Sequence, residues 1–208
     1  MIVEKEKELF EIWKQGKKNF VMDGVVDEHT FLEQKCHFVF ILKETDQMGN
    51  TALPTFLGDG APGNGGHTWN PVCRWLTGED RVFSLQERAD ILKKIAVVNL
   101  KKEDGGPNTD MAILENVVRE DKDYIKKQLS FYYTGITPVV FVCCGPYILS
   151  MLNDNILGKV DLHINKPLPY AKPDDREIYY VAFNHPNAKK AGLTKKFKLI
   201  ASLIGMTW

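Results

Sequence analysis

Four short, apolar runs constrain the fold of this chain most strongly. Each is rich in β-branched and aromatic residues, and each is followed by polar or glycine-containing sequence, which is typical of buried strands. The first three are nearly continuous in their apolar character, as in parallel strands that helices cover on both faces. The four predicted strands span residues 37–42, 95–100, 138–144 and 178–183.

Helical patterns occupy the segments between these runs. Ser84 and Glu87 form a capping-box pattern, which predicts a helix that continues to about Lys94. Apolar residues also recur at helical spacing in segments 4–17, 112–120, 123–131 and 188–204. Alternating strands and helices with right-handed crossovers predict an α/β fold, a three-layer α/β/α sandwich with a central four-stranded parallel sheet.

A single domain accounts for the whole chain. Its 208 residues can bury a substantial core, and neither a linker nor an internal repeat divides them. We therefore predict one domain over residues 1–208, with residues 1–35 as an N-terminal helical segment packed on it. In that segment Leu9, Phe10 and Trp13 share the face that we expect to meet the core.

Charge and hydropathy limit the classes of function. The 27 basic residues equal the 27 acidic ones, so any binding of nucleic acid needs a local positive patch. No apolar run approaches the roughly 20 residues of a membrane helix. The charged N-terminus lacks the core of a signal peptide. We expect a cytoplasmic protein with no membrane partner, and nothing in the sequence demands more than a monomer.

The cysteines do not have the spacing of a metal site. Cys143 and Cys144 are adjacent in a predicted strand, so their side chains should point to opposite faces of the sheet. Buried thiols fit this arrangement better than a zinc or iron–sulfur site, and we expect neither a metal nor a cofactor. The chain has four cysteines, Cys36, Cys73, Cys143 and Cys144.

A segment rich in glycine, proline and asparagine, residues 45–69, interrupts the alternation of strands and helices. It leaves the carboxyl end of the first predicted strand, where open α/β sheets bind ligands. Its pattern Gly58-x-Gly60-x-x-Gly63 matches a dinucleotide-binding motif, but no strong strand precedes it and Pro62 interrupts it. Because no convincing helix begins at its end either, we interpret the segment as a long functional loop.

Polar residues follow three of the predicted strands. Glu44 and Asp46 come just after the first strand, Asn99 lies near the end of the second, and His185 follows the fourth. Each has an ordinary explanation: solvated turn acids, an asparagine that satisfies a buried backbone, and a loop histidine. Together they place an acid, an amide and an imidazole at one edge of one sheet.

This combination resembles the uracil-DNA glycosylase superfamily from about Cys36 to the C-terminus. The first motif is similar to that of an uncharacterised bacterial group of glycosylase-like proteins. Lys43 and Thr45-Asp46 stand where the familiar first motifs carry glycine and proline, and the four-cysteine iron–sulfur pattern of one branch is absent. The resemblance rests on Leu42-Lys43-Glu44, Val97-Val98-Asn99 and Asn184-His185-Pro186.

The resemblance implies a DNA glycosylase that flips a damaged or modified base out of the helix and hydrolyses its N-glycosidic bond. Glu44 or Asp46 would stabilise the positive charge on the sugar and orient water, with Glu44 favoured. His185 would bind the base oxygen on which negative charge develops. Asn99 would read the polar edge of the base. Trp69 would form an aromatic wall, although a buried core tryptophan is an equally open interpretation.

DNA with a damaged or modified base is the expected partner. Phosphate contacts are expected from five lysines near the same edge: Lys101, Lys102, Lys189, Lys190 and Lys195. For Lys189, Lys190 and Lys195 a solvated lysine surface is the alternative.

Gln47 and Met48 follow Asp46, where uracil-specific enzymes carry a bulky aromatic residue.

The small residues after Asp46 predict a roomy pocket, and a substrate larger than uracil: a deaminated purine or a pyrimidine modified at its fifth carbon. The biological role would then be DNA repair or defence against phage. Two other classes of function stay open. One is a non-catalytic DNA-binding module of the same fold, and the other is a hydrolase of small nucleosides or nucleotides.

Overall fold

One mixed sheet of seven strands runs through the centre of the protein. The computed structural model describes residues 1–45, 48, 51–105, 108–164 and 166–205. Four strands of this sheet pair with one another in parallel, in the order β3-β2-β4-β7. They correspond to the predicted strands: β2 (His37–Leu42), β3 (Ile95–Asn99), β4 (Val139–Cys144) and β7 (Ile178–Phe183).

Three further strands make the sheet mixed and seven-stranded, which corrects the prediction of a central four-stranded parallel sheet. β1 (Gly24–Val25) pairs antiparallel with β3 at one side. At the other side β6 (Tyr170–Ala171) pairs antiparallel with β7, and β5 (Leu162–His163) pairs antiparallel with β6. Each of these strands has two residues, which is too few for a periodic sequence pattern.

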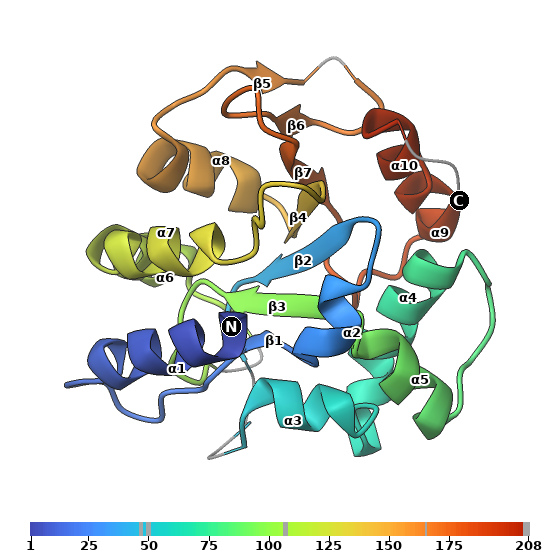
Figure 1. Ribbon diagram of the computed structural model, residues 1–208, viewed down its shortest axis with the longest axis horizontal. Coiled ribbons are helices and arrows are strands. Elements are labelled where there is room, and N and C mark those ends of the chain that lie inside the picture. Colours follow the sequence, from blue (N-terminus) through green and yellow to red (C-terminus); the bar gives the residue numbers. More distant parts are fainter. Residues whose placement is uncertain (46–47, 49–50, 106–107, 165, 206–208) are drawn as a thin grey trace.

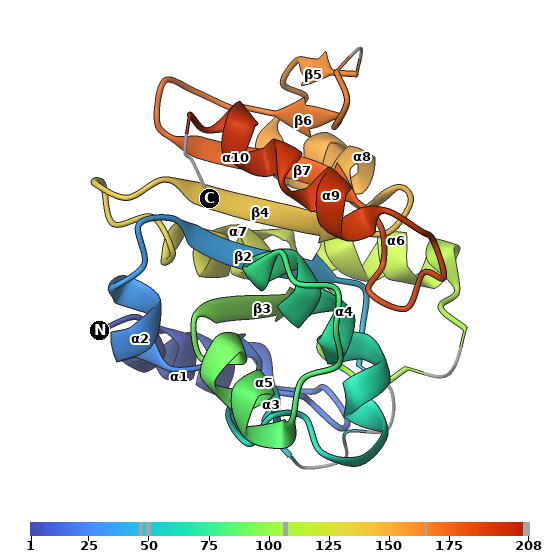
Figure 2. The ribbon, with the colours of Figure 1, turned by 90° about the vertical axis from the view of Figure 1, so that its right-hand side faces the viewer.

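Helices cover both faces of the sheet, so the fold has three layers (Figures 1 and 2). Two apolar clusters fill the spaces between the layers. The first face carries α1 (Ile2–Trp13), α6 (Met111–Glu120), α7 (Lys122–Ser130), α8 (Ile148–Leu152) and a π-helical turn, η2 (Asn153–Leu157). The second face carries α3 (Leu53–Gly58), α4 (Gly66–Thr77), α5 (Leu85–Leu92), α9 (Leu193–Phe197) and α10 (Leu199–Leu203). A short helix, α2 (Glu28–Leu32), precedes β2.

Several local predictions are confirmed. The side chain of Ser84 accepts a hydrogen bond from the backbone of Glu87, and the reciprocal bond completes the capping box at the start of α5. Leu9, Phe10 and Trp13 of α1 are buried in the first cluster. Cys143 and Cys144 belong to opposite clusters, as the alternation of side chains along a strand requires. All four cysteines are free and buried.

The glycine-rich segment is only partly a loop. It contains α3 and a 3₁₀ turn, η1 (Gly63–Gly65), and α4 begins at Gly66 directly after it. The prediction that no helix begins there is therefore wrong. Burial of one face of α4, including Trp69 and Trp75, outweighs the poor helix propensity of Gly66 and Pro71. Helix α3, and not a strand, precedes the glycines, so the context of a dinucleotide site is absent from these described residues.

The single C-terminal helix predicted over residues 188–204 is replaced by α9 and α10. Gly192 has φ 76°, a left-handed conformation that α-helical residues do not adopt, so α9 starts only after it. Among the described residues, every helix is too short or too polar to cross a lipid bilayer.

Candidate functional site at the carboxyl ends of the strands

The topology creates a switch point between β2 and β4. The chain passes from β2 to β3 on one side, and its next parallel strand, β4, lies on the other side of β2. In open α/β sheets, loops that leave such a pair in opposite directions form the crevice in which ligands bind. The segments that begin at Lys43 and Gly145 border this point. His185 follows β7, the neighbour of β4.

Glu44 is held firmly just beyond β2. Its Oε2 accepts a hydrogen bond from Lys101 Nζ at 2.6 Å, and its side chain is 7% exposed. A Cβ atom built on Gly105 would lie 2.2 Å from Glu44 Cδ, so the carboxylate needs glycine at that position. Gly105 also donates its N–H to Thr45 O at 2.8 Å. The segment after β3 thus fixes Glu44, while Asp46, the alternative acid, lies outside the described residues.

His185 presents one ring nitrogen as a donor. Its Nδ1 accepts the backbone N–H of Asn187 at 3.2 Å, which places the proton of the neutral ring on Nε2. Partial burial lowers the pKa of the ring, and the nearby charge of Lys43 lowers it further. At neutral pH the side chain is therefore an uncharged imidazole whose Nε2–H can donate a hydrogen bond.

Asn99 is tied to Asp23, the residue before β1. Its backbone N–H and its Nδ2 donate to Asp23 Oδ2 at 2.6 and 3.3 Å. Its Oδ1 is buried and has no hydrogen-bond partner among the described residues. Asn99 therefore satisfies a buried carboxylate, as the structural interpretation predicts. Its remaining acceptor, Oδ1, is covered by the surrounding residues, because Asn99 is only 1% exposed.

The prediction that Lys102 contacts DNA phosphate is wrong. Its side chain is 0% exposed, and its Nζ lies 2.7 Å from both carboxylate oxygens of Asp23. Nζ also donates to Gln128 Oε1 at 2.9 Å and lies 4.8 Å from the ring centroid of Trp13. Lys102 is the cation at the centre of a buried polar network, where a phosphate cannot reach it.

The same network extends to Glu6 through Tyr132. Gln128 Nε2 donates to Asp23 Oδ1 and to the Tyr132 hydroxyl, at 2.9 and 3.1 Å. That hydroxyl donates to Glu6 Oε1 at 2.5 Å. Burial raises the pKa of Glu6 to about 7, and the nearby charge of Asp23 adds to the shift.

Protonation of Glu6 should make stability depend on pH. In the unfolded chain the carboxyl ionises near its ordinary value of 4.5, whereas the folded protein keeps the proton until about pH 7. The contribution of Glu6 to the free energy of unfolding should therefore be greatest below pH 4.5. It should fall by about 3 kcal/mol as the pH rises to about 7. Urea unfolding at pH 5 and pH 8 would measure the slope. Glu6→Gln should remove most of it, and an unchanged slope would contradict the assignment.

The remaining predicted residues divide into buried and exposed ones. Trp69 is 4% exposed and packs in the second apolar cluster, the core position that the sequence left open. The ammonium group of Lys101 forms an ion pair with the carboxylate of Glu44. Lys189, Lys190 and Lys195 are exposed, on the segment that joins β7 to α9 and on α9 itself.

Tyr147 is a residue that the sequence reasoning missed. It follows Gly145 and Pro146 at the end of β4, beside the switch point, and it is 71% exposed. Its φ of 69° is left-handed, a conformation that costs a non-glycine residue about 1 kcal/mol or more. Glycine and proline directly after an apolar strand were the signal for a tight turn at this position.

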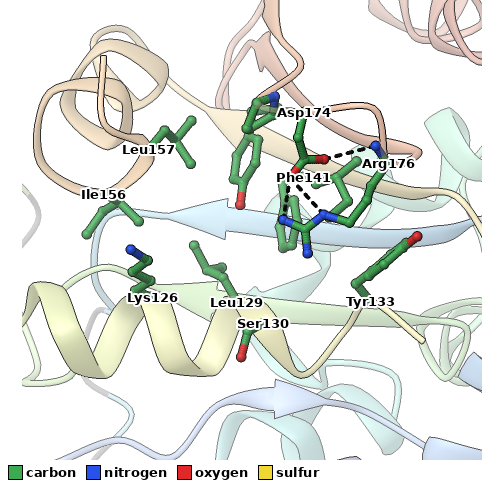
Figure 3. Close-up of a pocket in the computed structure, with 12 residues that line it drawn as sticks. Lys126, Leu129, Ser130, Tyr133, Phe141, Ile156, Leu157, Asp174 and Arg176 are labelled. Atoms are coloured by element: carbon green, nitrogen blue, oxygen red, sulfur yellow. Dashed lines mark hydrogen bonds and ion pairs between the residues drawn. The ribbon is translucent and has the colours of Figure 1, made fainter. Parts of the chain in front are cut away.

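A pocket of about 330 Å³ lies elsewhere, on the first face of the sheet between α7, η2 and the segment before β7 (Figure 3). The rings of Phe141 and Tyr180 stack with their centroids 4.5 Å apart, and both residues line the pocket. The ion pair of Arg176 and Asp174 lies at its margin. None of the predicted site residues that the structure describes lines this pocket.

The fold defines the class of the protein as α/β. Its candidate site lies at the carboxyl ends of the parallel strands, where Glu44 and His185 follow β2 and β7. Within the described ranges, no group of three or more His, Cys, Asp or Glu residues is arranged to hold a metal ion. The chain matches no protein-family model, and no curated protein matches it either.

Proposed function

We propose that the protein is a DNA glycosylase of the uracil-DNA glycosylase type. It would flip a damaged or modified base out of DNA, hydrolyse the N-glycosidic bond and leave an abasic site. The observation that carries the proposal is the placement of Glu44 after β2 and of His185 after β7, on either side of β4. An acid and a neutral imidazole thus follow two parallel strands whose carboxyl ends lie at the same edge of the sheet, in agreement with the resemblance of the sequence.

The chemistry of the reaction needs both groups. As the glycosidic bond breaks, positive charge develops on the sugar and negative charge on the departing base. The Glu44 carboxylate would stabilise the sugar cation and orient the attacking water. Its contact with Lys101 and its fit against Gly105 fix the carboxylate before the substrate arrives. His185 Nε2–H would donate to the base oxygen that gains negative charge.

Other residues would bind the base and the DNA. Tyr147 would supply the aromatic surface first sought at Trp69, because it is exposed at the switch point. Lys189, Lys190 and Lys195 would contact phosphates. The substrate class would be uracil, a deaminated purine or a 5-modified pyrimidine, in DNA repair or in defence against phage.

Release of bases from defined oligonucleotides tests the proposal. Single- and double-stranded substrates would each carry one altered base: uracil, hypoxanthine, xanthine, 5-hydroxymethyluracil or glucosylated hydroxymethylcytosine. We expect the wild type to release at least one base and Glu44→Gln to release it about 100-fold more slowly. Glu115→Gln, at an exposed position of α6, is the matched control and should keep full activity. Absence of release from every substrate would overturn the proposal.

One observation favours a non-catalytic DNA-binding module as the second candidate. The Glu44 carboxylate is already paired with Lys101 at 2.6 Å, as expected of a structural ion pair. A binding module would hold abasic DNA equally well with Glu44 or Gln at this position and would release no base. The neutral net charge instead favours a nucleoside or nucleotide hydrolase, for which free nucleosides would compete with DNA for the site.

A further inference from the structure

The pocket between α7, η2 and the segment before β7 has an apolar floor (Figure 3). Its volume of about 330 Å³ lies at the lower end of the range for small-molecule sites. Leu129, Ile156 and Ile178 line it and are at most 7% exposed. Phe141 and Tyr180 are register partners on β4 and β7, so their rings stack on the same face of the sheet. The floor therefore combines aliphatic side chains with two aromatic rings, against which the ring of a ligand can pack.

The hydroxyl group of Tyr180 is a polar group within this floor. It forms no hydrogen bond with any residue that the structure describes, although Tyr180 is only 6% exposed. Its oxygen is not fully enclosed by protein, so it reaches the space of the pocket that Tyr180 lines. Burial raises the pKa of this hydroxyl, which keeps it a neutral donor at physiological pH. A ligand oxygen that accepts its hydrogen bond would satisfy a donor that the protein leaves unpaired.

Two cations and one anion line the margin of the pocket: Lys126, Arg176 and Asp174. Asp174 Oδ2 accepts hydrogen bonds from Nε of Arg176, at 2.7 Å, and from Nη2, and these bonds fix the guanidinium plane. The Cζ atom of Arg176 also lies 5.4 Å from the ring centroid of Tyr133.

The margin keeps donors for an anion. Arg176 Nη1 has no hydrogen-bond partner among the described residues, and Figure 3 shows one guanidinium nitrogen that points away from Asp174. Lys126 forms no ion pair within the described part of the chain. With one carboxylate against two cations, the margin carries a net positive charge, and a planar guanidinium suits a carboxylate in particular.

We propose that this pocket binds a small aromatic carboxylate. Its ring would pack against Leu129 and the stacked rings of Phe141 and Tyr180. Its carboxylate would accept hydrogen bonds from the unpaired N–H groups of Arg176, with Lys126 as a second positive charge. The Tyr180 hydroxyl would donate to an oxygen of the ligand. None of the described residues assigned to base release lines this pocket, so the inference goes beyond the proposed function and does not depend on it.

Calorimetric titration of the full chain with 2-naphthoate, without DNA, tests the proposal. We expect saturable binding with a Kd of about 1 mM or lower. Arg176→Gln should weaken the binding of 2-naphthoate about 10-fold and leave that of the uncharged analogue 2-naphthamide unchanged. Tyr180→Phe should weaken the binding of 2-naphthoate about 5-fold. Its urea midpoint of unfolding should not fall, because the hydroxyl has no partner in the described protein, whereas a structural role would lower that midpoint.

Two variants outside the pocket are matched controls. Arg119→Gln removes an exposed guanidinium from α6, and Tyr170→Phe removes a hydroxyl from β6, so both should bind 2-naphthoate as the wild type does.

Three outcomes would overturn the inference. Absence of saturable binding at about 10 mM 2-naphthoate would refute the site. Equal affinity of Arg176→Gln and the wild type would show that the ligand binds elsewhere. Tighter binding of octanoate than of 2-naphthoate would indicate a site for acyl chains and refute the aromatic class. Each outcome leaves the proposed glycosylase function untouched, because that function is measured by base release.

Discussion

Replacement of Asp23 by Asn is expected to lower the free energy of unfolding by about 3–5 kcal/mol. The carboxylate accepts hydrogen bonds from the side chains of Lys102 and Gln128 and from the backbone of Asn99, at distances between 2.6 and 2.9 Å. An amide would oppose a donor to at least one of these donors and would leave the Lys102 cation buried without a counter-charge. This is the largest effect on stability that we expect from one substitution.

Urea unfolding of Asp23→Asn, compared with the wild type, would measure the loss. In the double variant Asp23→Asn/Lys102→Met the buried charge is also removed, so part of the lost stability should return. Glu115→Gln breaks an exposed ion pair with Arg119 and should cost less than about 1 kcal/mol. A loss below about 1 kcal/mol for Asp23→Asn would show that the network contributes little.

Replacement of His185 by Ala is expected to slow base release by about 100- to 1,000-fold, with little change in DNA affinity. The removed Nε2–H is the donor proposed for the base oxygen, and it matters most when that oxygen carries charge. Burial, with the nearby charge of Lys43, lowers the pKa of His185 below its ordinary value of 6.5. The midpoint of any loss of rate through protonation of this ring should accordingly lie below pH 6.5.

Single-turnover release of the base identified in the oligonucleotide panel would measure this effect. His163→Ala is the matched control, since that histidine is exposed on β5 and stacks on Tyr170. Its release rate should equal that of the wild type. If His185→Ala released the base at the wild-type rate, the assignment of the donor would be refuted, whereas a loss confined to binding would place His185 in DNA recognition.

Much of the fold was predictable because it depends on local patterns. The four long strands are continuous apolar runs, and α5 begins with a capping box that is visible in the sequence. The strands β1, β5 and β6 were not predictable, since two residues carry no periodicity. Helix α4 was missed because its glycine and proline disfavour a helix locally, and only burial against the sheet favours it.

The candidate site was predictable to the extent that it depends on strand ends. Glu44, Asn99 and His185 came from the residues at the ends of three strands, and the structure places them at one edge. The role of Lys102 could not be predicted, because its partner Asp23 is 79 residues away in the sequence. Lys43 was named only as part of the first motif, whereas its position beside Gly145 is a property of the folded chain.

The two short strands that border the sheet have a consequence for behaviour at high concentration. β1 and β5, each of two residues, are the outermost strands. An exposed border of six apolar residues, such as Ile178–Phe183 would present, is a template on which other chains add by backbone pairing. By ending the sheet in such short strands, the fold offers neighbouring molecules almost no backbone to extend and so disfavours fibrous self-association.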